Sequence, residues 1–227
     1  MNFLSYDSKF GQLFVKFFNS CYLNLIWLVC SIPLFTVGAS TTALYYVTLK
    51  IARGEETSSV VRMFFRSFRE NFRQSTVLWL IMLAAGLLLA GDGYILFHLR
   101  ASSAGAAAVF WTLLLAVLIV AAIAYVIVLF YIFPLIASVS NTNAAMLKYS
   151  FLIGVRYLFC TILMFGVNFA MFFVIVRVFT PIIIFGEGMC AMIISHFLYR
   201  VIDACSYAPG ELDDDELDDD EPDGGTA

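Results

Sequence analysis

The sequence predicts an all-α membrane protein: a polytopic helical bundle with about five transmembrane helices and cytoplasmic amphipathic helices at the membrane interface. Hydrophobic residues make up 62% of the 227 positions, and charged residues make up only 13%. A soluble domain usually carries about 25% charged residues. Several apolar runs also reach the roughly 20 residues that a helix needs to cross the hydrocarbon core of a bilayer. We therefore expect a multi-pass protein of the cell membrane.

The predicted transmembrane domain covers residues 1–205 and contains five apolar runs. The runs are 18–37, 76–98, 106–133, 155–178 and 181–199. The third is the clearest because it carries no charge, and the first is the weakest because Asn24 lies inside it and Pro33 near its end. No small-residue cleavage site follows the first run, so we expect an uncleaved membrane segment rather than a signal peptide.

Two short interfacial helices, 39–53 and 58–74, are predicted between the first two spans. The stretch VVRMFFRSFRENFRQS (60–75) contains four arginines and four phenylalanines. On a helix of about 100° per residue they form two adjacent stripes. The stripes are Arg62, Arg66, Arg69 and Arg73, and Phe64, Phe65, Phe68 and Phe72. Such a helix suits the surface of a bilayer, with rings among the acyl chains and arginines at anionic phospholipid headgroups. A docking surface for a partner protein is the alternative interpretation.

The distribution of basic residues predicts the orientation of the chain. The segment 38–75 holds six Lys and Arg residues and the segment 134–156 holds two, whereas the link 99–105 holds only Arg100. Short loops rich in Lys and Arg face the cytoplasm. With five spans, this rule places the N-terminus outside and the C-terminus in the cytoplasm, although Lys9 and Lys16 oppose it.

The C-terminal residues 206–227 form a predicted disordered acidic tail. Ten of the seventeen acidic residues lie in 211–227, with Pro and Gly and almost no apolar residues. A segment of this composition cannot bury enough apolar surface to fold. Without it, the chain carries thirteen basic and seven acidic residues.

Polar side chains inside the apolar runs are candidate sites for a transported solute. The candidates are Asn24, Asp92, Asn168 and His196. Buried polar groups in a membrane often mark substrate pathways, but they also join helices by hydrogen bonds. Arg177 and Glu187 lie on either side of the turn between the last two runs. We interpret them as helix-capping residues or as charged side chains near the membrane interface.

Catalytic, metal and nucleic-acid sites have no support in the sequence. The chain lacks G-x-S-x-G, H-E-x-x-H and Walker motifs, so we expect no enzyme and no cofactor. Its five cysteines form no C-x-x-C pair and its two histidines lie far apart, so neither a metal site nor a disulfide is expected. Basic surface is confined to one region and the acidic tail would compete with a nucleic acid, which argues against nucleic-acid binding.

Two segments resemble the YesL-like family of bacterial integral membrane proteins. They are LNLIWLVCSIPLFTVGASTTALYYVTLKIARGEE (23–56) and FFRSFRENFRQSTVLWLI (64–81), and the similarity is dense over about 1–90 and looser afterwards. The family has no characterised biochemical function, and its genes commonly lie beside those of carbohydrate ABC importers. The resemblance implies a non-enzymatic accessory or interaction component of carbohydrate uptake, with importer permease subunits as partners. The alternative is a small transporter or channel for a solute in its own right.

Overall fold

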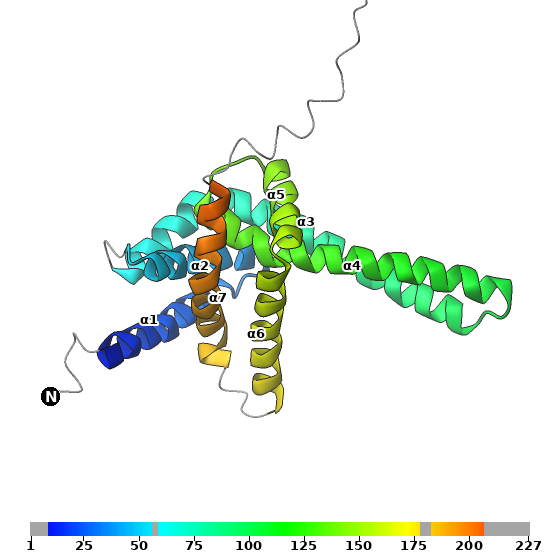
Figure 1. Ribbon diagram of the computed structural model, residues 1–227, viewed down its shortest axis with the longest axis horizontal. Coiled ribbons are helices and arrows are strands. Elements are labelled where there is room, and N and C mark those ends of the chain that lie inside the picture. The colour runs from blue at the N-terminus through cyan, green and yellow to red at the C-terminus, as the bar shows by residue number, and fades with distance from the viewer. Residues whose placement is uncertain (1–8, 56–58, 178–182, 207–227) are drawn as a thin grey trace, which may run out of the picture.

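The computed structural model describes residues 9–55, 59–177 and 183–206 (Figure 1). Within these ranges the chain is helical and contains no strand, which confirms the predicted all-α class. The elements in chain order are α1 (Lys9–Cys30), η1 (Leu34–Thr36), α2 (Val37–Arg53), α3 (Val60–Ala101), α4 (Ala106–Ser138), α5 (Asn143–Arg156), α6 (Leu158–Arg177) and α7 (Ile183–Ser206). The predicted acidic tail lies outside the described residues, apart from its first position.

Helix α2 is the centre of the body. Eleven of its 17 residues are buried, and it packs against α1, α3, α4 and α7. The run of small residues GASTTA (38–43) allows this close packing, because small side chains let helix backbones approach one another. A Cβ atom on Gly38 would lie 2.5 Å from Trp79 Cβ and 2.6 Å from the Ser75 carbonyl oxygen. The helix predicted over 39–53 therefore exists, but other helices cover it instead of headgroups.

Hydroxyl groups join α2 to its neighbours inside this apolar body. Each pair lies at 2.6–2.9 Å: Ser31 with Ser40, Thr42 with Ser75, and Thr48 with Ser195. Interhelical hydrogen bonds of this kind contribute about 0.6 kcal/mol on average in membrane proteins. They also satisfy buried hydroxyls that would otherwise be costly in an apolar environment.

Helix α3 combines the predicted interfacial helix 58–74 and the predicted span 76–98 in a single element of 42 residues. At 1.5 Å per residue it is about 63 Å long. The preceding helix ends because Gly54 adopts a left-handed conformation with φ of 73°. No Gly or Pro occurs between Val60 and Ala85, so nothing interrupts the helical hydrogen bonds at the expected boundary.

The second half of α3 (84–101) and the first half of α4 (106–124) run together and project from the body, and we call this hairpin the arm (Figure 1). Only 6% of the most apolar stretch of either helix is buried. Tyr125 fixes the base of the arm by donating a hydrogen bond to the Met82 carbonyl at 3.0 Å. An apolar exterior of this length matches the hydrocarbon core of a bilayer.

Three of the described helices, α3, α4 and α6, are long and apolar enough to cross a membrane. They contain most of the predicted spans 76–98, 106–133 and 155–178, and they fit a multi-pass membrane protein. The first predicted span, 18–37, is interrupted because α1 ends at Cys30, just before Pro33, which leaves a shorter apolar helix over Phe18–Cys30. The run 181–199 begins outside the described residues and continues in α7. Five transmembrane helices are thus not confirmed.

A candidate interaction surface on α3

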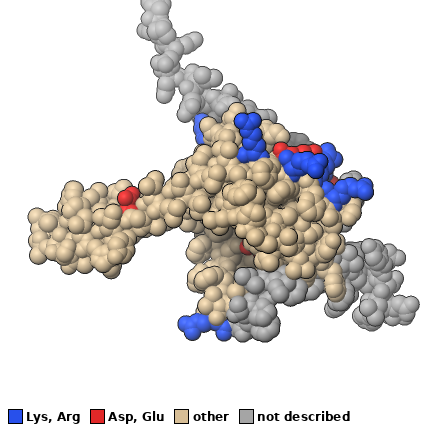
Figure 2. Space-filling model, turned by 180° about the vertical axis from the view of Figure 1, so that it is seen from behind, with Lys and Arg blue, Asp and Glu red and all other residues tan. Residues whose placement is uncertain are grey.

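Four arginines form a charged surface on the first half of α3. Arg62, Arg66, Arg69 and Arg73 are all exposed on one side of the first half of α3, and we call this surface the basic face. The opposite side of the same helix is buried, through Met63, Phe64, Ser67 and Ser75. Figure 2 shows most of the visible Lys and Arg on the upper part of the body, a further group at the lower end of the molecule, and none on the visible face of the arm.

Most of the charge on the basic face is available to a partner. Arg66 donates from Nε to the Glu70 carboxylate at 2.9 Å, and the two side chains are 70% and 55% exposed. This hydrogen bond raises the pKa of Arg66. Solvent screens an ion pair this exposed, so Arg66 can exchange Glu70 for another carboxylate. No carboxylate in the described part of the chain pairs with Arg62, Arg69 or Arg73.

The phenylalanine stripe is divided between the protein core and the surface. Phe64 is fully buried, and Phe68 packs against the core, whereas Phe65 is 49% exposed. The Phe64 and Phe68 rings stack with centroids 6.2 Å apart, and Phe68 lies 5.4 Å from Phe72. The expectation that the whole stripe enters the acyl chains is wrong for Phe64. The helical periodicity correctly predicts the side of α3 on which Phe64 lies, but that side packs against the body of the protein and not against lipid.

The basic face is held rigidly by bonds on both sides of its C-terminal end. Ser75 and Thr42 share a hydrogen bond of 2.9 Å between α3 and α2. Gln74 Nε2 donates to the Asn141 carbonyl in the link between α4 and α5 at 2.7 Å. The arginines are therefore presented on a fixed helix rather than on a mobile loop.

The structure does not bring the four intramembrane polar candidates together. Asn24 is fully buried, and its Oδ1 accepts the Gly188 N–H at 2.8 Å between α1 and α7. Asn168 donates to a carbonyl of its own helix at 2.9 Å. His196 is exposed and packs edge-on against two aromatic rings, and Asp92 is exposed on the arm.

The grooves beside α6 give no support to a solute path through these residues. The groove between α4 and α6 is lined by aliphatic and aromatic side chains and Thr161, and the groove along α6 is wholly apolar. None of the four polar candidates lines either groove. Asn24 instead has the geometry of a polar link between helices.

Metal coordination has no candidate in the described part of the chain, where no three His, Cys, Asp or Glu side chains are grouped suitably. The four described cysteine thiols are free. Of these, Cys21, Cys160 and Cys190 are buried and Cys30 is partly exposed. The side chain of Cys205 lies outside the described residues.

Comparison with known proteins finds a family match over about a third of the chain. Residues 21–92 match the family described as "Protein of unknown function, DUF624". Over 176 residues the chain is 25% identical to "Uncharacterized protein YteU" of Bacillus subtilis (strain 168), covering 74% of this chain and 72% of YteU. Over 74 residues it is 34% identical to "Uncharacterized protein YesL" of the same organism, covering 31% of this chain and 35% of YesL. Over residues 21–92 the chain resembles the YesL-like family. No solved structure matches the chain.

The region that matches the family contains the central helix α2, the whole basic face and the base of the arm. The resemblance predicted from 23–56 and 64–81 is thus confirmed. The two relatives carry no activity in their names, and the family description indicates no enzyme.

Proposed function

We propose that this protein is a non-enzymatic component of the membrane that docks a partner protein through its basic face. One observation carries the proposal. An amphipathic helix that only anchors to lipid must insert its apolar side into the bilayer, but the apolar side of α3 is occupied by the body through Phe64 and Phe68. The apolar side of α3 is thus already packed against the rest of the protein, and the arginines project from the opposite side. This is the arrangement of a protein-binding surface.

The chemistry of the basic face defines the partner. Arginine forms two parallel hydrogen bonds with a carboxylate, which gives geometric specificity as well as charge attraction. The partner surface should therefore carry Asp or Glu at a matching helical spacing. The family resemblance suggests the class of partner, a permease subunit of a carbohydrate ABC importer, and the protein would then be an accessory of carbohydrate uptake.

We place the basic face in the cytoplasm, with the N-terminus outside and the C-terminus inside. Most basic residues of the chain lie in segments 38–75 and 134–156, which supports this orientation by the positive-inside rule. In Figure 1 the first residues of α1 and the last residues of α6 lie on one side of the body, and the last residues of α7 lie on the other. Arg53 at the end of α2 pairs with Asp203 near the end of α7 at 2.6 Å, so these two helix ends share that second side.

The test is co-purification of importer subunits with the tagged full-length protein from its native membrane. The double variant Arg62→Glu with Arg69→Glu should reduce capture about 100-fold, because each lost charge-assisted contact is worth about tenfold or more. The matched control is Arg177→Glu, at the far end of α6. Arg62→Lys with Arg69→Lys keeps the charge and should weaken capture by a smaller factor if paired hydrogen bonds matter.

Membrane insertion is measured in the same samples by labelling of introduced cysteines from each side. Four of the six basic residues of segment 38–75 remain in the double variant, so its orientation should not change. Undiminished capture by a correctly inserted double variant would refute docking through the basic face. A wild-type protein that captures no importer subunit but another acidic membrane protein would refute only the assignment of the partner.

A further inference from the structure

A groove at the start of α6 combines two arginines with an apolar wall. It has a volume of about 460 Å³. Arg156, at the end of α5, and Arg200, in α7, line its polar end, and Phe159, Leu163 and Phe197 line its apolar part. These arginines lie on other helices than the basic face and have no part in the proposed docking.

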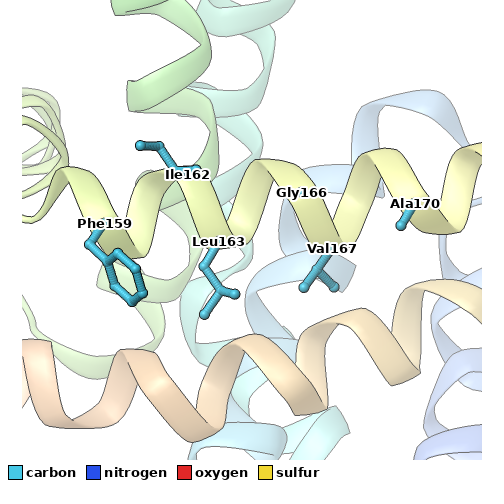
Figure 3. A pocket seen from close by; sticks show the side chains of 6 residues that line it. All are labelled: Phe159, Ile162, Leu163, Gly166, Val167 and Ala170. Atoms are coloured by element: carbon cyan, nitrogen blue, oxygen red, sulfur yellow. The ribbon is translucent and has the colours of Figure 1, made fainter.

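The apolar part of this groove continues along α6 towards the middle of the helix. A second hollow of about 370 Å³ shares Phe159 and Leu163 with the first and extends through Gly166 to Ala170. Figure 3 shows Phe159, Leu163 and Val167 pointing from α6 to the side where α7 runs. From Leu158, the first residue of α6, to Ala170 the helical rise is about 18 Å. That length exceeds half of a hydrocarbon core of roughly 30 Å, so the groove has the depth of one leaflet.

Both arginines at the polar end are free to bind an anion. They are exposed, and no carboxylate in the described part of the chain pairs with either. Arg200 Nε donates to the Tyr199 hydroxyl at 3.1 Å, and its guanidinium lies 5.7 Å from the centre of that ring. These contacts orient the Arg200 side chain without neutralising it, which prepares it for a phosphate.

We propose that this groove is a binding site for one anionic phospholipid, with its phosphate between Arg156 and Arg200 and one acyl chain along α6. The arrangement of charge and apolar surface selects this occupant. A free phosphate would leave the apolar hollow unfilled, and a neutral hydrocarbon would leave two arginines without a counter-charge. Basic pockets between helices at the cytoplasmic side of a membrane bind anionic headgroups in this way.

Two variants test the two halves of the site separately. Arg156→Gln with Arg200→Gln removes the headgroup contacts. Gly166→Leu fills the hollow, and a Cβ atom at this position meets nothing within 4 Å, so the helix accommodates the new side chain. Leucine also favours a helix interior over glycine. The controls are Arg177→Gln at the opposite end of α6 and Gly91→Leu on the arm, where a Cβ atom is likewise unobstructed.

The experiment uses the full-length protein in vesicles of phosphatidylcholine and phosphatidylglycerol, with a small fraction of photoactivatable phosphatidylglycerol. Native mass spectrometry counts the retained lipid, and peptide mapping locates the crosslink. Wild type should retain one phosphatidylglycerol, crosslinked within 159–170. Each arginine near an anionic lipid contributes about fivefold, so the double glutamine variant should bind about 30-fold more weakly. Gly166→Leu should lose the crosslink in 159–170, and both controls should behave as wild type.

Equal retention of phosphatidylcholine and phosphatidylglycerol would refute the role of the arginines. Crosslinks confined to the basic face, or a double glutamine variant that binds as wild type does, would refute the site. Occupation of Arg156 and Arg200 by the acidic tail of the chain, detected as a crosslink between the two, would also overturn the proposal. Importer capture is measured independently, so failure of this site leaves the proposed docking function untouched.

Discussion

Replacing Gly38 with alanine should separate α2 from α3. The added Cβ would lie 2.5 Å from Trp79 Cβ and 2.6 Å from the Ser75 carbonyl oxygen. Carbon atoms in contact normally stay about 3.5–4.0 Å apart, so the two helices must move about 1 Å. Neither obstructing atom can escape by a side-chain rotation, because one is a Cβ and the other belongs to the backbone.

The cost of this separation has three terms. Overpacking of a core costs about 1–3 kcal/mol. The hydrogen bond between Thr42 and Ser75, now 2.9 Å, would stretch to about 3.9 Å and be lost, at about 0.6 kcal/mol. Alanine returns about 1 kcal/mol through its better helix propensity. We take about 2 kcal/mol, the middle of the range, for overpacking. The three terms together should lower the free energy of unfolding by about 2 kcal/mol.

Gly166→Ala is the matched control for this substitution. Its Cβ meets nothing within 4 Å, so only the propensity gain remains and the variant should be stabilised by up to about 1 kcal/mol. Both variants are unfolded by titrating sodium dodecyl sulfate into mixed micelles and following helix content by circular dichroism. If Gly38→Ala proves as stable as Gly166→Ala, the close contact of α2 with α3 is wrong.

The same titration tests three further contacts. Thr48→Val and Ser195→Ala should each lower the free energy of unfolding by about 1 kcal/mol, with a coupling of about 0.6 kcal/mol in the double variant; purely additive effects would argue against their hydrogen bond. Arg53→Ala should cost about 1 kcal/mol or less because the pair is partly exposed. The exchange Arg53→Asp with Asp203→Arg should recover most of that loss, and no recovery would contradict the pair. Asn24→Ala should cost about 1 kcal/mol by removing an acceptor between α1 and α7, and an unchanged stability would exclude that link.

The membrane class and the longest helices were predictable because their signals are local. An apolar run of 20 or more residues predicts a spanning helix whatever surrounds it, and α3, α4 and α6 all contain such runs. The end of α2 at Gly54 was also predictable, since glycine adopts the left-handed conformation at low cost.

The position of α2 and the burial of Phe64 were not predictable from periodicity. A helical wheel gives the direction of a side chain but not the element that lies opposite. One signal was present and was missed. The run GASTTA, with three hydroxyl residues among small ones, is typical of a helix packed closely inside a membrane protein.

The length of α3 has a mechanical consequence. The basic face and the tip of the arm belong to one helix, so the two regions cannot move independently. From Arg73 to Arg100 the helix rises about 40 Å. A tilt of about 10° imposed at the arginines would then displace the tip by about 7 Å across the membrane, as a lever does. A force applied to α3 at the basic face can in this way change the lipid or protein contacts of the arm through the helix itself.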